Sequence, residues 1–312
     1  MMVKRIIINF PTNLGDAIIG LPVLDRLRSN YPQAKISAIT SPKTRDFFIR
    51  NTFIDEVILF DKSWKLGTKI KFCLYLRGKY DLIADLKNSF LPIALGIRKR
   101  TPFIRRFSNK VHIEDKYLSL ISAVAPKEAS EKSSFILQDS EKDKWNYLET
   151  KRAIFIACSS LSSIKQYPYT HLKEVVSFFQ NKQNIIILGQ EQDRGFYRDI
   201  LKQRCVIDLV GKTDINDVFY LLKKYASLLL GVDSSITHMA NYLDLPVVCL
   251  FGPTSHERSF PRSKHSIVLR REELGCSPCE MAQCEHDIEC MKIAPQEVIE
   301  AINKILKNAK TK

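Results

Sequence analysis

The sequence lacks an apolar run long enough to cross a bilayer. Of its 312 residues, 45% are hydrophobic and 26% are charged, as in an ordinary soluble globular protein. No apolar run approaches the roughly 18 residues that a membrane-spanning helix needs. The first stretch, MMVKRIIINF, has a basic pair, but its apolar part is too short for a signal-peptide core and no small-residue cleavage site follows. We therefore expect a cytoplasmic protein whose mature chain starts at the first strand.

Acidic residues are scarce relative to basic ones. Asp and Glu number 34 against 48 Lys and Arg, so the formal charge is +14. Such a surplus attracts an anionic partner, which could be nucleic acid, an anionic membrane face or a phosphorylated substrate. The motifs of nucleic-acid modules are also missing: there is no ribonucleoprotein-type aromatic strand, no zinc finger of Cys-Cys-His-His spacing and no basic heptad helix. A nucleic-acid partner is therefore not predicted.

The eight cysteines are unevenly distributed. Four lie in apolar segments, where buried reduced thiols are expected: Cys73, Cys158, Cys205 and Cys249. The others form a cluster near the C-terminus: Cys276, Cys279, Cys284 and Cys290. A cytoplasmic cluster that starts with C-x-x-C suggests metal ligation, whereas an exported protein more often uses disulfides. The spacing permits tetrahedral zinc, but we favour structural thiols, reduced or partly bridged, over a structural zinc site.

Strand-like apolar runs alternate with helical patterns along the chain, which is typical of parallel sheets with crossover helices. Strands are predicted at 5–10, 35–40, 56–60 and 81–86 in a first series, and at 153–158, 184–189, 206–211, 227–233 and 247–252 in a second. Residues 125–145, between the two series, are rich in Ser, Lys and Glu, which suits a surface connection. We predict two doubly wound α/β domains, residues 1–150 and 151–312. Ligands should bind in a cleft between them, beyond the carboxyl ends of the strands.

The first polar segment after a strand is FPTNLGDAIIG, residues 10–20. Gly15 permits a tight turn, and Asp16 falls at the start of a helix that Pro22 should bend or restart. This is where many α/β proteins hold a phosphate, which a carboxylate would repel. Asp16 is therefore either a helix cap stabilised by the helix dipole or a functional carboxylate with another task.

Two segments of the second series carry single candidates. In CSSLSSIKQYP, residues 158–168, small hydroxyl residues follow a strand and Lys165 is either a phosphate ligand or one more solvated lysine. In LGQEQDRGF, residues 188–196, Glu191 stands near the place where dinucleotide folds put a ribose-binding acid. It could equally be a residue that starts a helix.

The segment GVDSSITHMANYLDLPVVCLFGPT, residues 231–254, is the most informative. Asp233, Ser234 and Ser235 open a helix directly after a strand. The exposed N–H groups of such a helix start, with serine hydroxyls beside them, form a diphosphate-binding site. His238 lies in the first turns and could donate to the same anion, although a lone helical His is more often structural.

Together these segments resemble the heptosyltransferase family, whose members transfer heptose from ADP-heptose onto the inner core of lipopolysaccharide. The matching parts, in order, are N-L-G-D with a later L-P-x-L-x-x-L-R, K-x-[aromatic]-P, D-S-x-x-x-H, P-V-V-x-L-F-G-P-T, and C-x-x-C with two further Cys. The resemblance runs over most of the chain. Two positions depart from the family pattern: Ser235 replaces the usual Gly, and Tyr167 replaces the commoner Trp.

The resemblance implies a GT-B architecture of two facing Rossmann-like domains, and an inverting transfer that needs no cofactor and no obligatory metal. Asp16 would be the general base that takes the proton of the acceptor hydroxyl as it attacks the anomeric carbon. The second domain would bind the diphosphate and ribose of ADP-heptose through Lys165, Glu191, Asp233, Ser234, Ser235 and His238. A GT-B transferase or epimerase that uses another nucleotide sugar, or a non-catalytic polyanion-binding protein on this fold, is the alternative.

A basic stretch, IRKRTPFIRRF at residues 97–107, lies in the expected acceptor domain. It would suit the phosphates and carboxylates of a lipopolysaccharide precursor at the inner leaflet, at about 1 kcal/mol per basic residue near an anionic surface. It could also be a solvated loop. The candidate acceptor ligands are Arg98, Lys99, Arg100, Arg105 and Arg106. We therefore predict a cytoplasmic protein peripheral to the inner face of the inner membrane.

Overall fold

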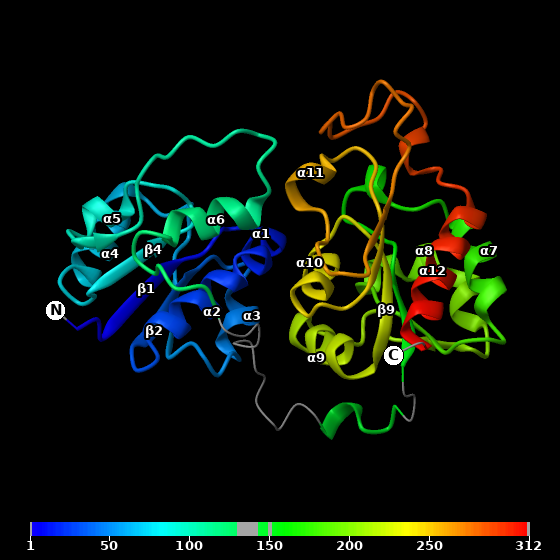
Figure 1. Cartoon of the computed structure of the whole chain (residues 1–312), viewed down its shortest axis with the longest axis horizontal. Coiled ribbons are helices and arrows are strands. Elements are labelled where there is room, and N and C mark those ends of the chain that lie inside the picture. Colours follow the sequence, from blue (N-terminus) through cyan, green and yellow to red (C-terminus); the bar gives the residue numbers. More distant parts are fainter. Residues whose placement is uncertain (1, 130–142, 149–151, 311–312) are drawn as a thin grey trace. The chain divides into compact units, whose positions relative to one another are not determined.

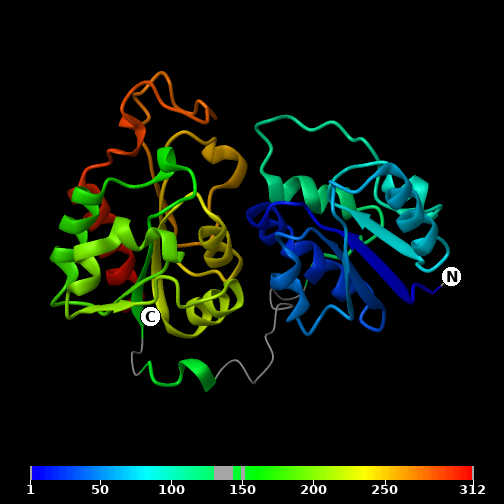
Figure 2. The same ribbon diagram turned by 180° about the vertical axis from the view of Figure 1, so that it is seen from behind.

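The computed structural model describes residues 2–129, 143–148 and 152–310. The chain divides into two compact units, Met1–Asp139 and Ser140–Lys312. Each unit is a parallel sheet covered by helices on both faces (Figure 1, and Figure 2 from behind). The predicted α/β fold class with two parallel sheets is confirmed. The domain boundary predicted near residue 151 lies outside the described residues. No helix in the described part of the chain is long and apolar enough to span a membrane.

The first unit is a five-stranded sheet with the order β3-β2-β1-β4-β5. Its strands are β1 Arg5–Asn9, β2 Lys35–Thr40, β3 Glu56–Leu59, β4 Leu82–Asp85 and β5 Lys99–Arg100. Its helices are α1 Leu14–Ile19, α2 Leu21–Asn30, α3 Arg45–Ile49, α4 Leu66–Leu76, α5 Leu91–Ala94 and α6 Ile113–Ile121. The central strands are buried on both faces, which is why they appear in the sequence as continuous apolar runs.

The second unit is a six-stranded sheet with the order β11-β10-β9-β6-β7-β8. Its strands are β6 Ala153–Ala157, β7 Ile185–Ile187, β8 Val206–Asp208, β9 Ala226–Val232, β10 Val247–Leu250 and β11 Ile267–Leu269. Its α-helices are α7 Tyr169–Phe179, α8 Arg194–Tyr197, α9 Ile215–Tyr225, α10 Ser235–Tyr242, α11 His256–Ser259 and α12 Pro295–Lys310. Short 3₁₀ helices are η2 Asp143–Trp145, η3 Ser163–Lys165, η4 Glu191–Asp193, η5 Arg198–Lys202 and η6 Glu289–Met291.

All nine predicted strands are present, with ends shifted by at most three residues. Strands β5 and β11 were not predicted, because two or three residues are too few to show a strand pattern. Pro22 lies in the first turn of α2 and the helix restarts there as expected, since a first-turn residue needs no N–H donor. The tight turn predicted at Gly15 is wrong: α1 begins at Leu14, so Gly15 lies inside the helix.

The connection between the units is only partly a surface segment. Residues 130–142 lie outside the described part, but Trp145, at the end of the predicted connection, is 2% exposed. Its indole N–H donates to Asp217 at 2.9 Å, and its carbonyl accepts from Tyr225 Oη at 3.0 Å. The end of the predicted surface connection is therefore anchored by a buried side chain. The one tryptophan in this polar stretch of the sequence was a usable signal for a buried contact.

Asp85 organises the carboxyl end of the first sheet. It is fully buried at the end of β4. Its carboxylate accepts from Asn9 Nδ2 at 2.6 Å, from the Ser89 N–H at 2.6 Å and from the Lys87 N–H at 3.2 Å. These bonds tie β1 to the segment that leads into α5. A buried carboxylate is tolerated here because several donors replace its water.

We predict that Asp85→Ala lowers the free energy of unfolding of the first unit by about 3 kcal/mol or more, because several buried donors lose their acceptor. The chain has two tryptophans, Trp64 in the first unit and Trp145 in the second. Urea unfolding followed by Trp64 fluorescence, with Trp145→Phe in every variant, measures this unit alone. Asp46→Ala removes a carboxylate that is 85% exposed and serves as the control. Equal unfolding midpoints for both variants would contradict the assignment.

Candidate active site

A polar cluster lies at the carboxyl edge of the second sheet. Asp233 follows β9 directly, Lys165 ends η3 in the loop after β6, and Thr254 lies in the loop after β10. Strands β6, β9 and β10 are adjacent and parallel, so their carboxyl ends bring these loops together. This edge is where the sequence predicts the ligand site.

The carboxylate of Asp233 is the centre of this cluster. Its Oδ2 atom lies 3.0 Å from Lys165 Nζ and accepts from Thr254 Oγ1 at 2.8 Å. Its Oδ1 atom lies 3.6 Å from His238 Nε2 and accepts from Ser259 Oγ at 3.4 Å. The Asp233 side chain is 12% exposed, whereas that of Lys165 is 26% exposed and can still reach a ligand.

The electrostatic balance at Asp233 keeps its carboxylate charged. Burial by itself would raise the pKa of Asp233, but nearby His238 and Lys165, with the hydrogen bonds from Lys165 and Thr254, outweigh burial and leave the pKa below its ordinary value. The buried carboxylate therefore holds the Lys165 ammonium and the His238 ring at the edge of the sheet. An arriving anion meets groups that are already in position.

Helix α10 contributes its N-terminus to the same place. Ser234 is the N-cap residue, and its buried Oγ atom has no hydrogen-bond partner in the described part of the chain. Thr237 Oγ1 donates to the Val232 carbonyl at 2.6 Å, which fixes the helix against β9. Free N–H groups at a helix start attract anions. The helix start and the hydroxyl predicted from DSSITH are thus both present beside Asp233.

Two buried tyrosines support the loop that carries Lys165. Tyr197 Oη accepts from the N–H groups of Cys158 and Ser159, both at 3.0 Å. Tyr167 is fully buried and donates to the Ile293 carbonyl at 2.9 Å. The aromatic residue of the K-x-[aromatic]-P motif is therefore a core anchor for the lysine two positions before it. Tyr197 was not predicted, since nothing in the local sequence marks its partner.

Glu191 lies outside the Asp233 cluster. It follows β7 at the carboxyl edge of the same sheet, and its Oε1 atom accepts from Arg194 Nε at 2.7 Å. That hydrogen bond lowers the pKa of Glu191. A Cβ atom at Gly211, which has φ of +71°, would lie 3.1 Å from the Glu191 Cα atom, so only glycine fits against this acid. Its ribose-binding role stays a prediction, and the arginine that donates to both of its carboxylate oxygens was not predicted.

Asp16 lies in the first unit, in the first turn of α1 and half-buried. Its carboxylate has no hydrogen bond and no ion pair with any residue that the structure describes. The N-cap position is Asn13, and no side-chain capping bond is present there. Because no described residue bonds to the Asp16 carboxylate, a substrate group could bind it without displacing a protein partner.

The five predicted acceptor ligands lie in β5 or beside it in the chain. Lys99 is in register with Leu82 at the start of β4, and its Nζ atom lies 4.9 Å from the centre of the Tyr31 ring. Arg105 lies in the loop after β5, where its N–H donates to Asn88 Oδ1 at 2.9 Å. Arg98 directly precedes β5, Lys99 and Arg100 form it, and Arg105 and Arg106 lie in the loop after it. That these residues bind an acceptor stays a prediction.

The terminal cysteines surround one small cavity. A cavity of about 170 Å³ is lined by Cys276, Cys279, Cys284 and Cys290, with Ile164 and Pro253 on its wall. All four thiols are free, so no partial bridging is present. Burial, followed by the three neighbouring thiols, raises the pKa of Cys290. Among the scattered cysteines, Cys158 and Cys249 are buried as expected, and Cys73 and Cys205 are half-buried.

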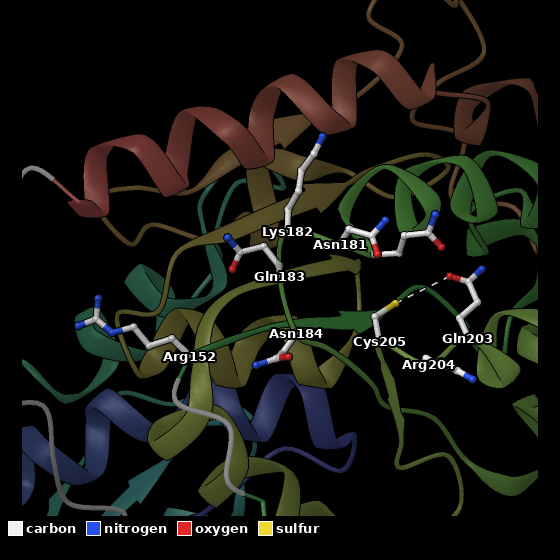
Figure 3. A pocket seen from close by; sticks show the side chains of 9 residues that line it. Arg152, Asn181, Lys182, Gln183, Asn184, Gln203, Arg204 and Cys205 are labelled. Carbon is white, nitrogen blue, oxygen red and sulfur yellow. Dashed lines mark hydrogen bonds between the residues drawn. The ribbon is translucent and has the colours of Figure 1, made fainter.

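A wider hollow lies at the other edge of the second sheet (Figure 3). It has a volume of about 830 Å³ and lies where β6, β7 and β8 begin. Amide and basic side chains line it, among them Arg152, Gln183 and Arg204. Lys182 lies with its Nζ atom 3.3 Å from the centre of the Phe178 ring. The hollow lies at the amino ends of the strands, which is the edge opposite to the carboxyl edge. We therefore do not assign the active site to it.

Thr254 and Ser259 are site residues that were not predicted. Both donate to Asp233, one from the loop after β10 and the other from α11. The G-P-T at the end of β10 was a usable signal for Thr254, because a hydroxyl residue directly after a strand end lies at the ligand edge. Ser259 carries no such signal, since only the fold places it near Asp233.

Two parallel α/β units, with Lys165 and a helix N-terminus at one carboxyl edge, define the class of α/β proteins that can bind a phosphate-bearing ligand at that edge. Residues 71–288 match glycosyltransferase family 9 (heptosyltransferase), and the chain belongs to this family. The predicted family and the predicted enzyme class, a glycosyltransferase, are confirmed.

The chain aligns with known proteins over nearly its whole length. The chain is 25% identical to lipooligosaccharide heptosyltransferase 2 of Campylobacter jejuni serotype O:6, covering 96% of this chain and 99% of that protein. The crystal structure of a family 9 glycosyltransferase from Veillonella parvula covers 98% of this chain and 97% of its own, with a TM-score of 0.80 and 21% identity. An E. coli heptosyltransferase with ADP-2-deoxy-2-fluoro heptose covers 98% of this chain and 100% of its own, with a TM-score of 0.69 and 14% identity. The predicted GT-B fold class is thereby confirmed.

We predict a pH-dependent stability from Asp233. Because its pKa is lowered in the folded protein, its stabilising contribution is present above the unfolded value near 3.8 and is lost as pH falls through the lower folded value. At neutral pH, Asp233→Asn should cost about 2–3 kcal/mol, the size of a hydrogen bond to a charged group. The difference from wild type should shrink toward pH 3, as urea midpoints will show. Asp199→Asn, a control at a 53% exposed carboxylate, should change little.

Proposed function

We propose that this protein transfers heptose from ADP-heptose to the inner core of lipopolysaccharide, with Kdo-lipid A or an already heptosylated core as acceptor. One observation carries the proposal: Lys165 and His238 are held by Asp233 beside the free N-terminus of α10, in a chain of family 9. The names of the relatives, and the ADP-2-deoxy-2-fluoro heptose in the complex of the E. coli heptosyltransferase, support the choice of donor.

The second unit would bind the donor. The Lys165 ammonium, the α10 N–H groups and the Ser234 hydroxyl would contact the diphosphate, and Glu191 would accept from the ribose hydroxyls. As the bond between the anomeric carbon and the phosphate oxygen breaks, negative charge grows on the departing ADP. Cations and amides already in position stabilise that charge without reorganising, so positive groups of the protein can do this without a required cofactor.

The first unit would supply the base. The acceptor hydroxyl oxygen forms a bond to the anomeric carbon on the face opposite to the leaving ADP, which inverts the configuration. Its proton passes to the Asp16 carboxylate. An unpartnered, half-buried carboxylate suits this task, because no hydrogen bond from the protein has to be broken first. We therefore assign residues 1–150 to the acceptor and residues 151–312 to the donor.

We predict that Asp16→Asn lowers turnover by about 100-fold to 10,000-fold, the usual contribution of a general base. Turnover is measured as ADP release from ADP-heptose and Kdo-lipid A. ADP binding, measured by calorimetry, should be unchanged, because Asp16 does not contact the donor in this mechanism.

Lys165→Met is the matched control, with the opposite pattern: ADP should bind at least tenfold more weakly, since a charge-assisted contact is worth more than about 1.4 kcal/mol. Normal turnover of Asp16→Asn would rule out the base assignment while leaving the donor site intact. ADP release from a different nucleotide sugar would establish the alternative transferase. No ADP release from any sugar donor would favour a polyanion-binding protein.

We further propose that the enzyme works at the anionic inner face of the membrane and contacts it through the first unit. Residues 62–113 hold thirteen Lys and Arg but only two Asp and no Glu, so this stretch accounts for +11 of the formal +14. Asp85 is fully buried, and Asp81 accepts hydrogen bonds from the N–H groups of Lys4 and Arg5. Asp81 is thus the one acidic side chain that this stretch leaves partly exposed beside its thirteen basic residues, and anionic lipid attracts such a surplus.

Helix α4 has an apolar stripe on its outer side. Leu66, Ile70 and Leu74 are 74%, 51% and 62% exposed, and their spacing of four residues places them on one side of the helix. Phe72 and Leu76 are buried on the other side. The helix thus packs on the sheet with one face and leaves large apolar side chains on the other, as membrane-surface helices do.

Helix α5 extends this surface. Phe72 of α4 and Leu91 of α5 pack against the same hydrophobic cluster, so both helices cover the same face of the sheet (Figure 1). Phe90 and Ile93 are 61% and 41% exposed, and the Phe90 ring lies 5.9 Å from that of Phe103 in the loop after β5. Basic residues between these apolar groups complete what we call the α4–α5 face, residues 65–107.

We predict that the protein sediments with phosphatidylglycerol-rich vesicles but not with neutral phosphatidylcholine vesicles. Lys69→Glu with Lys71→Glu should weaken binding at least tenfold at low salt, at about 1 kcal/mol per charge removed. Leu66→Ser with Leu74→Ser should weaken it further without changing the charge. Lys173→Glu with Lys202→Glu, in the second unit, makes the same change in net charge and is the control.

Equal losses in the Lys69/Lys71 variant and in this control would mean that net charge, and not the α4–α5 face, attracts the vesicles. ADP release with a water-soluble acceptor should remain normal in all of these variants. Membrane attachment and catalysis can therefore fail independently.

A further inference from the structure

The loop between β11 and η6 is unusually long for its lack of internal structure. Residues 270–288 contain no helix and no strand, and most of their side chains are exposed. Loops longer than about 12–15 residues without their own secondary structure are uncommon in compact domains, since little burial offsets the entropy of ordering them. We call residues 270–290 the cysteine loop. Some interaction other than burial in a hydrophobic core must therefore keep this loop ordered.

The cysteine loop is attached beside the candidate active site. Ser277 Oγ donates to the Gly252 carbonyl at 2.8 Å, and the Glu280 N–H donates to the Pro253 carbonyl at 2.8 Å. Gly252 and Pro253 directly precede Thr254, which donates to Asp233. Order in the cysteine loop therefore supports the position of a site residue.

Four thiols of this loop face one cavity of about 170 Å³. One end is fixed by the core: Cys290 is 7% exposed, and a Cβ atom at Gly252 would lie 3.1 Å from its sulfur. The His286 backbone nitrogen lies 3.4 Å from Cys284 Sγ, and its N–H is directed at a sulfur that would carry charge as a thiolate. Cys276 and Cys279 are exposed, three positions apart in a segment without helix or strand.

We propose that Cys276, Cys279, Cys284 and Cys290 bind one thiophilic divalent metal ion, Zn²⁺ or Fe²⁺, which closes the cysteine loop. A C-x-x-C pair and two further Cys supply four sulfur ligands, the number of a closed tetrahedral site. This replaces the preference for metal-free thiols drawn from the sequence, because all four thiols line one cavity and none is bridged.

Binding would require a local rearrangement. In the described part of the chain, no three Cys, His, Asp or Glu side chains are grouped as a finished metal site. Each thiol would lose its proton to become a ligand, and the exposed C-x-x-C pair would close over Cys284 and Cys290. The binding free energy of the metal would then contribute to the order of the loop, as it does in small metal-stapled domains.

The test uses the full chain, expressed in medium with zinc and iron and purified under reducing conditions without a chelator. We expect about one metal ion per chain, as a single four-ligand site requires. Zinc content and iron content are measured separately by mass spectrometry. Cys279→Ser with Cys284→Ser should lose most of the metal. Cys205→Ser, at a half-buried cysteine outside the loop, should keep it.

Thiol labelling provides a second measurement if the double variant fails to fold. In the wild-type protein, a chromogenic disulfide reagent should react slowly with the four loop thiols until a strong chelator is added, and then quickly. A reduced wild-type chain that retains neither Zn²⁺ nor Fe²⁺ after reconstitution, or whose loop thiols react equally fast with and without chelator, would overturn the proposal. Neither readout depends on heptose transfer, so the metal site and the proposed activity are judged separately.

Discussion

The candidate active site depends on one buried carboxylate. Asp233 is nearly shielded from water, and a charge in such a place is stable only when partners replace its hydration. Lys165, His238 and Thr254 are those partners, and they come from three different segments that follow or border three strands. The need to keep this charge satisfied therefore fixes the relative positions of loops that are far apart in the sequence.

This arrangement has a consequence for an anionic ligand. A diphosphate beside Asp233 would be repelled by the carboxylate alone, but Lys165 pairs with that carboxylate beside the start of α10 and offsets its charge. The carboxylate orients Lys165 and His238. In metal sites, carboxylates that hydrogen-bond to the ligating side chains orient those side chains in the same way. Tyr197 and Ser277 form hydrogen bonds with backbone groups around this cluster, and such supporting contacts favour a site that is in position before its ligand arrives.

Much of this could be predicted from the sequence, because parallel strands buried on both faces appear as apolar runs and their following residues share one edge. That logic found Lys165, Asp233 and His238. It missed Ser259 because α11 reaches Asp233 only through the tertiary fold. It also missed β5, which Lys99 and Arg100 form, because a two-residue strand shows no pattern in the sequence.

The two units use positive charge in different ways. Residues outside 62–113 carry only +3 of the +14, although the donor-type site lies among them. A diphosphate is small, and a few aimed groups with a buried counter-ion suffice to bind it strongly and in one orientation. A membrane surface is broad. Its attraction for a protein depends on the summed charge within about a Debye length rather than on the exact positions of single side chains. In the proposed function, the surplus on the first unit would supply long-range attraction to the membrane, and near-neutrality elsewhere would leave Lys165 available to the nucleotide.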